Sequence, residues 1–123
     1  MSFKRLILLT VFFVTMAPAM VSAQEPRFFS MLNDVPLMPG LYEVAKDSMS
    51  FDKAEGRIVE TSAASETLNT GQIKAFYASA LPQLGWIASG AGDSYVRGGE
   101  KLSLRLESKG ALNIVHLSLS PAP

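Results

Sequence analysis

The stretch Tyr95-Val96-Arg97-Gly98-Gly99-Glu100-Lys101-Leu102 decides the fold, because it sets the register of the strands around it. Gly98-Gly99 predicts a two-residue hairpin turn. The cross-strand pairs that follow from this turn are Arg97 with Glu100, Val96 with Lys101 and Tyr95 with Leu102. We expect the first of these to be an ion pair at the end of the hairpin, worth at most about 1 kcal/mol on an exposed surface.

The register extends into a second hairpin, for which we expect a four-residue loop over 108–111. The expected pairs are Leu106 with Asn113, Leu104 with Val115 and Leu102 with Leu117. Side chains alternate between the two faces of a strand, so one face becomes almost wholly apolar. Carried back through a loop at 90–93, the register adds two further residues to it. The expected members are Trp86, Ala88, Tyr95, Leu102, Leu104, Leu106, Val115, Leu117 and Leu119.

The opposite face is mixed in character. Its expected members are Ile87, Val96, Lys101, Ser103, Arg105, Ile114, His116 and Ser118. Ile87, Val96 and Ile114 are expected to form a small contiguous apolar patch, and such patches often mark contact sites. Either the segment 24–40 covers the patch or a partner does. We favour the first explanation, because the apolar residues of that segment themselves need burial.

Apolar residues at steps of three and four predict a helix that begins after Asn69. Asn69 and Gln72 have the spacing of a capping box, and Leu68 can pack onto the first turn. Because Pro82 removes a helical hydrogen bond, we expect the helix to stop or kink near residue 81, with Gly85 as the final stop. The stripe that is expected to cover the apolar sheet face is Ile73, Phe76, Tyr77, Ala80, Leu81 and Leu84.

Residues 24–64 carry weaker signals. Strands are expected at 49–52 and 57–63, joined by a hairpin loop at 53–56, but no turn fixes how they pair with the later strands. Pro36 and Pro39 exclude a regular helix, and Pro39-Gly40 predicts a type II turn. We therefore expect an extended arm at 24–40 and a single α+β domain at 41–123. In that domain one helix packs on an antiparallel sheet, in the order strand, strand, helix and four strands.

Residues 1–23 have the three parts of a secretory signal peptide: Lys4 and Arg5, an apolar run over 6–14, and small residues ending at Ala23. The apolar run is short for a membrane span of about 20 residues. We expect cleavage after Ala23; cleavage at Ala17-Pro18-Ala19 and an uncleaved anchor are the alternatives. With no cysteine to carry a lipid, the mature protein is expected to be soluble, without a membrane anchor, and periplasmic or secreted.

Composition and charge exclude several classes of protein. The 123 residues include no cysteine, so a disulfide framework, a cysteine-ligated metal and a cysteine nucleophile are all excluded. Eleven basic residues balance eleven acidic ones, and nucleic acid is therefore not an expected partner. A lone histidine without converging carboxylates predicts no metal site and no cofactor.

His116 is the only histidine, and the register places it opposite Ser103. A serine–histidine pair needs an orienting carboxylate for nucleophilic catalysis. The expected neighbours are instead the cations Lys101 and Arg105. Enzymatic activity is therefore not the favoured hypothesis.

The run Phe76-Tyr77-Ala78-Ser79-Ala80-Leu81-Pro82-Gln83-Leu84-Gly85-Trp86 has the pattern FYxxxLPxLGW, followed by Tyr95-Val96-Arg97 and Glu100-Lys101-Leu102. With Pro36-Leu37-Met38-Pro39-Gly40, these motifs resemble those of an uncharacterised family of small exported bacterial proteins. The resemblance covers about residues 35–121 and implies a shared fold. It implies no catalytic or binding residue.

Two hypotheses of function follow. In the first, the protein is a periplasmic or secreted binding or accessory module that contacts an envelope protein. Its candidate interaction residues are Ile87, Val96, Arg105, Ile114 and His116. In the alternative, it is a small-ligand binder or enzyme with a pocket between helix and sheet, lined by Tyr77, Trp86 and Tyr95. A closed core would exclude that pocket, and an envelope factor without a discrete site is the third option. The residue pattern predicts no oligomeric state.

Overall fold

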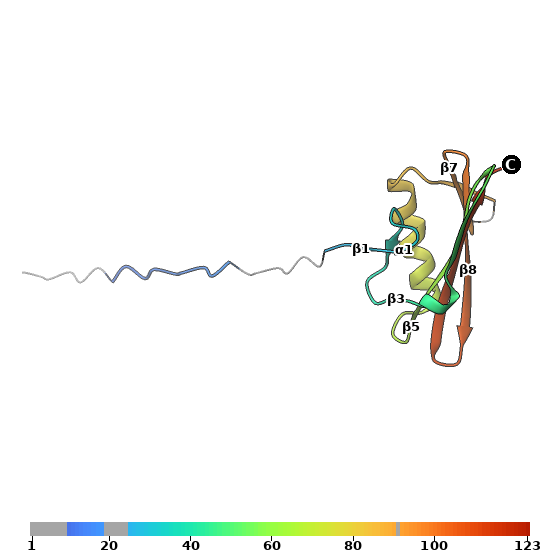
Figure 1. Ribbon diagram of the computed structural model, residues 1–123. Helices are drawn as coiled ribbons and strands as arrows, with labels where there is room; N and C mark the ends of the chain where they lie inside the picture. The colour runs from blue at the N-terminus through green and yellow to red at the C-terminus, as the bar shows by residue number, and fades with distance from the viewer. Residues whose placement is uncertain (1–9, 19–24, 91) are drawn as a thin grey trace, which may run out of the picture.

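An antiparallel sheet with one helix on one of its faces forms the body of the protein (Figure 1). The computed structural model describes residues 10–18, 25–90 and 92–123. The helix α1 spans Thr70–Gln83. The strands of the large sheet are β3 (Tyr42–Glu43), β4 (Met49–Lys53), β5 (Gly56–Ser65), β6 (Ile87–Ser89), β7 (Ser94–Arg97), β8 (Glu100–Lys109) and β9 (Leu112–Pro121), and a short 3-10 turn, η1 (Ala45–Asp47), precedes β4. The α+β class expected from the sequence is confirmed.

The large sheet has the strand order β3-β5-β9-β8-β7-β6, and β4 lies along the same edge of β5 as β3. The expected hairpin of β4 and β5 is present, with a loop of two residues, Ala54 and Glu55, between the closing pair Lys53 and Gly56. The sequence did not determine how the β4–β5 hairpin pairs with the later strands. In the structure β5 pairs with β9, with Thr61 opposite Leu117. Strand β5 therefore lies beside β9, the last strand of the chain.

The first hairpin has the predicted register, but the second does not. Tyr95 lies opposite Leu102, as expected. The β8–β9 hairpin is closed by Lys109 and Leu112, so the predicted four-residue loop is wrong and Leu104 lies opposite Leu117. Gly110 has a φ of 61°, which makes Gly110-Ala111 a tight turn of the Gly-X type. Because the shift is two residues, each side chain keeps its predicted face.

Helix α1 begins as predicted and continues past residue 81 to Gln83, with Gly85 as its final stop, as predicted. The side chain of Asn69 accepts a hydrogen bond from Gln72 N–H at 2.8 Å, and the Gln72 side chain accepts one from Asn69 N–H at 2.9 Å. Gly85, with a φ of 90°, ends the helix. Trp86 N–H donates to the carbonyl of residue 81 at 3.1 Å and Gly85 N–H to that of residue 82 at 3.2 Å. This Schellman motif pairs the carbonyls of residues 81 and 82, and Pro82 lies inside the final turn of the helix.

Residues 25–41, named here the N-terminal hairpin, are part of the core rather than an extended arm. Strand β1 (Arg27–Phe28) pairs with β2 (Pro36–Leu37). At Pro39-Gly40 the predicted turn is present, because Gly40 has a φ of 96° and Leu41 N–H donates to the Met38 carbonyl at 2.9 Å. The buried residues that the N-terminal hairpin adds to the core of α1 and the sheet are Phe29, Leu32, Val35, Leu37 and Leu41.

The N-terminal hairpin lies beside α1, on the same side of the sheet (Figure 1). The prediction that it covers Ile87, Val96 and Ile114 is therefore wrong, and Ile87 is 68% exposed. The N-terminal hairpin lies beside α1 because the sheet is wider than one helix. A helix is about 10 Å across, whereas neighbouring strands are about 4.8 Å apart, so a path of six strands is much wider than the helix. A second element must fill the rest of the apolar face.

The buried hydroxyl of Tyr77 fastens the N-terminal hairpin to α1. It donates to the Pro36 carbonyl at 2.7 Å and accepts from Met38 N–H at 3.3 Å. Burial raises the pKa of Tyr77 far above its usual value, so the hydroxyl keeps its proton. Tyr77 is fully buried together with Ile73 and Leu81 of the same helical stripe.

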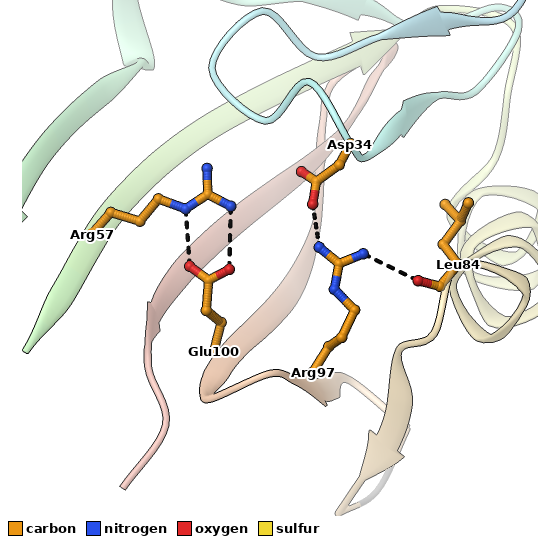
Figure 2. Close-up of polar contacts among 5 residues, drawn as sticks. All are labelled: Asp34, Arg57, Leu84, Arg97 and Glu100. Atoms are coloured by element: carbon orange, nitrogen blue, oxygen red, sulfur yellow. Dashed lines mark hydrogen bonds and ion pairs between the residues drawn. The ribbon is translucent and has the colours of Figure 1, made fainter.

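The predicted ion pair of Arg97 with Glu100 is replaced by two others (Figure 2). Arg97 pairs with Asp34 of the N-terminal hairpin, donates to the Leu84 carbonyl at 3.1 Å, and stacks 4.3 Å from the Trp86 ring centroid. Glu100 accepts from Arg57 at 2.9 and 3.2 Å and raises the pKa of that guanidinium. The sequence prediction failed because neither Asp34 nor Arg57 belongs to the hairpin on which it was based.

Within the described residues, no helix is long and apolar enough to cross a membrane. The predicted signal peptide falls largely on residues 1–9 and 19–24, which lie outside the described residues, as does the expected cleavage after Ala23.

The N-terminal hairpin can be tested with two adjacent phenylalanines. Phe29 is 1% exposed and Phe28 is 44% exposed. We expect Phe29→Ala to lower the free energy of unfolding by about 3–5 kcal/mol, because it removes a core side chain. Phe28→Ala is expected to cost less than about 1 kcal/mol. Urea unfolding measures both; equal costs would contradict the burial of this segment.

Tyr77→Phe tests the link between the N-terminal hairpin and α1. The change keeps the ring but leaves the Pro36 carbonyl and Met38 N–H without their shared partner. We expect a loss of about 1–3 kcal/mol in the free energy of unfolding. Tyr42→Phe, at an exposed tyrosine, is the matched control and should change stability little. A neutral Tyr77→Phe variant would contradict a structural role for the hydroxyl.

Candidate functional site: the helix-free face of the sheet

The face of the sheet turned away from α1, here the helix-free face, carries all five candidate interaction residues. Pairing shows this directly: Ile87 lies opposite Val96, and His116 lies opposite Arg105. Ile114 is two residues from His116 on the same strand and points to the same side. Neither α1 nor the N-terminal hairpin packs on this face (Figure 1).

The apolar residues of the helix-free face do not form the contiguous patch that the sequence predicted. Ile87 and Val96 are neighbours on β6 and β7. Ile114 lies on β9 opposite Glu107, so that strand β8 separates it from the other two. The patch is therefore divided between the β6 edge and the middle of the sheet.

A second group of exposed apolar side chains lies at the opposite edge, and the sequence analysis missed it. Its members are Tyr42, Met49 and Phe51. Met49 lies opposite Glu60 and Phe51 opposite Ile58, which places them on the helix-free face. The alternation of apolar and polar residues in Met49-Ser50-Phe51-Asp52 was the available signal. The sheet face on which the apolar residues lie depends on how β5 pairs with the later strands, and no turn in the sequence fixed that pairing.

An open hollow of about 550 Å³ lies between these two edges. Its lining is mainly polar and comes from strands β5, β9, β8 and β7, together with Asp47 of η1 and Asp93. The lining residues that matter here are Glu60, Ser62, Ser103, Arg105, His116 and Ser118. The Ser118 hydroxyl donates to Glu60 at 3.3 Å. Arg105 and His116 are thus brought together, as the sequence predicted, at the floor of a polar depression.

His116 is held at both ring nitrogens. Nε2 lies 2.7 Å from Oε2 of Glu107, and Nδ1 lies 2.8 Å from Oγ of Ser62. An ionised carboxylate can only accept, so in the neutral imidazole Nε2 carries the hydrogen and Nδ1 accepts from the serine hydroxyl. The hydrogen bond to His116 lowers the pKa of Glu107. The expectation that no acidic residue lies beside His116 is wrong, because the two-residue register shift brings Glu107 there.

Serine, imidazole and carboxylate in a row have the composition of a catalytic triad, but in this row the serine hydroxyl is not accessible to a substrate. Ser62 is only 3% exposed, and its hydroxyl is bonded to Nδ1 of His116. A substrate would have to reach that oxygen beside an oxyanion-binding site. What the row does is link β5, β9 and β8 and fix the imidazole. In the part of the chain that the structure describes, no group of three His, Asp or Glu residues is placed to hold a metal ion.

The alternative pocket between helix and sheet is filled by the core. Tyr77, Trp86 and Tyr95 are all buried and belong to the main apolar cluster. The Tyr77 hydroxyl is used by the N-terminal hairpin. Tyr95 borders a shallow hollow of about 240 Å³, which Tyr77 and Trp86 do not line. These residues therefore build the fold and do not converge on a ligand.

A further hollow of about 690 Å³ lies between the N-terminal hairpin and Phe76. Three prolines and the Phe76 ring form much of its wall, and Glu25 and Arg27 supply charged groups at its rim. It begins where residue 24, outside the described part of the chain, joins Glu25. Its described lining residues include no histidine and no serine.

Comparisons with protein-family models, with curated proteins and with solved structures find no match. The family resemblance drawn from the FYxxxLPxLGW pattern therefore stays a prediction. In the structure, the residues of that pattern end the helix at Gly85 and fill the core with Tyr77, Leu81 and Trp86. They explain a fold and are not part of the helix-free face.

The link between Glu107 and His116 predicts a dependence of stability on pH. The folded-state pKa of Glu107 lies below its usual value of 4.5. Its contribution to stability is therefore present above about pH 4.5 and is lost as the pH falls through the lowered folded-state pKa. Glu107→Gln should flatten this acid loss in urea unfolding measured between about pH 6 and pH 3. Glu55→Gln, in the β4–β5 loop, is the control; identical profiles for the wild type and Glu107→Gln would refute the link.

Proposed function

We propose that the protein is an interaction module of the bacterial cell envelope that contacts a partner protein through the helix-free face. The observation that carries this proposal is the distribution of apolar burial. Both α1 and the N-terminal hairpin pack on one side, and the other side keeps exposed apolar residues at each edge. Exposed apolar groups of this kind are typical of contact surfaces.

The centre of the face supplies groups that could make such a contact specific. The Arg105 side chain is mostly exposed and lies only 3.8 Å from Glu107. His116 offers an imidazole whose orientation is fixed by two hydrogen bonds. A partner that spans the face would bury Ile87 and meet these polar groups with its own. Polar groups held in place lose little conformational entropy on binding, which favours recognition.

The cellular site of this function is part of the proposal. The basic, apolar and small-residue segments of residues 1–23 have the organisation of a secretory signal. Cleavage after Ala23 would deliver the chain to the periplasm or outside the cell. The proposed partner is accordingly a protein of the envelope.

Site-specific photo-crosslinking in cells tests this function. A photoreactive residue at position 87 or 105 should give a discrete crosslinked species with another protein. The same residue at Ala78, exposed on α1, is the matched control and should not. In addition, Arg105→Glu should weaken the crosslink from position 87, while Lys74→Glu on α1 should leave it unchanged. Equal crosslinking from position 78, or none from the helix-free face, would refute the proposal.

A further inference from the structure

Strand β4 forms an edge of the sheet and is accessible along its whole length. All five residues from Met49 to Lys53 are exposed, and among the strands that the structure describes β4 pairs only with β5. The edge at the other end of the sheet, β6, is only three residues long. An exposed edge strand is a template for a further strand, which proteins otherwise avoid with short strands, charges or covering elements.

The backbone of β4 has a free row of hydrogen-bonding groups. A two-residue hairpin loop is closed by a hydrogen-bonded pair, here Lys53 with Gly56. Hydrogen bonding alternates along antiparallel strands, so Phe51 and Met49 also direct their backbone groups to β5. Ser50 and Asp52 therefore direct theirs outward, away from the sheet.

The side chains of β4 and of the residues before it are self-complementary about Ser50. Asp47, which ends η1, lies three residues before Ser50, and Lys53, which ends β4, lies three residues after it; both are exposed. Met49 and Phe51 flank Ser50 and point to the helix-free face. When two such strands run antiparallel, the start of one meets the end of the other. The acidic end then faces the basic end, and each methionine faces a phenylalanine.

We infer that β4 pairs antiparallel with β4 of a second copy of this chain, across a two-fold axis at Ser50. In this register Ser50 faces Ser50 and Met49 faces Phe51 of the other copy. Asp47, the last residue of η1, precedes the paired strand and comes at the end of the interface where Lys53 of the other copy lies. Sulfur–aromatic contacts and opposite charges both favour the arrangement. Cleavage after Ala23 would remove Lys4 and Arg5 and leave 9 basic against 11 acidic residues, a net charge of −2, which opposes the approach of two copies only weakly.

The axis is perpendicular to the sheet, so the two copies place their helices on the same side. The two helix-free faces then join into one continuous surface. This pairing goes beyond the proposed function, because it uses the β4 edge and not Ile87, Arg105 or His116. Five residues of strand make a small interface, for which a concentration-dependent equilibrium is the expected behaviour.

Single-cysteine variants test the register, since the natural chain has no cysteine. Cα atoms of a hydrogen-bonded antiparallel pair are about 5.5 Å apart, within the range of roughly 4.4–6.8 Å that a disulfide spans. Ser50→Cys should therefore form a disulfide-linked dimer under mild oxidation. Asp52→Cys, on the same edge and equally exposed, is the control. The two residues at position 52 would be four residues apart along the strands, about 13 Å, and should not link.

Charge reversal gives an independent test by sedimentation equilibrium of the protein purified after export of the full chain. Lys53→Asp should raise the dimer dissociation constant at least about tenfold, because it places two acidic groups together. Combining it with Asp47→Lys should restore dimerisation, which a variant damaged in folding would not do. Ile87→Asp should leave dimerisation unchanged even where it abolishes partner crosslinking. A wild-type protein that stays monomeric, with Ser50→Cys linking no faster than Asp52→Cys, would overturn the inference.

Discussion

The width of the sheet is the constraint on which the rest of the structure depends. One helix cannot cover the apolar side of a sheet with six strands on its main path. The N-terminal hairpin fills the remaining area, and Tyr77, through its bonds to Pro36 and Met38, fixes it against α1. Arg97 then binds Asp34, the end of α1 and the Trp86 ring at once. Because both covering elements pack on one side, neither of them covers the other side of the sheet.

The polar centre of the helix-free face is a product of strand register. Ser62, His116 and Glu107 come from three different strands, and each is positioned only by the pairing of β5, β9 and β8. No short motif in the sequence brings them together. The row fixes an imidazole at the floor of an open hollow without exposing a nucleophile, which suits recognition better than catalysis. This is why the proposed function rests on a surface rather than on a reaction.

Local signals in the sequence predicted local structure well. Gly98-Gly99 fixed one register, and Asn69 with Gln72 fixed the start of the helix, because in both cases the interacting atoms are only a few residues apart. Contacts between distant segments were not predictable in this way. The partners of Arg97 and Glu100 depend on where Asp34 and Arg57 lie in the fold. The face on which Met49 and Phe51 are exposed depends on the pairing of β5. The second hairpin was predicted with a register wrong by two residues, although Gly110 followed by a non-glycine residue is a recognisable two-residue turn.

The alternation of β8 and β9 has a consequence for how the chain folds. A slip of two residues between these strands leaves every apolar side chain on the same face, so hydrophobic burial hardly distinguishes the slipped pairing from the native one. The native pairing is selected by directional groups: the turn at Gly110, the Glu107–His116 bond, and Asn113, whose amide donates to the Leu68 carbonyl at 2.8 Å. These polar contacts therefore favour the native β8–β9 pairing over the pairing slipped by two residues, which hydrophobic burial alone would not exclude.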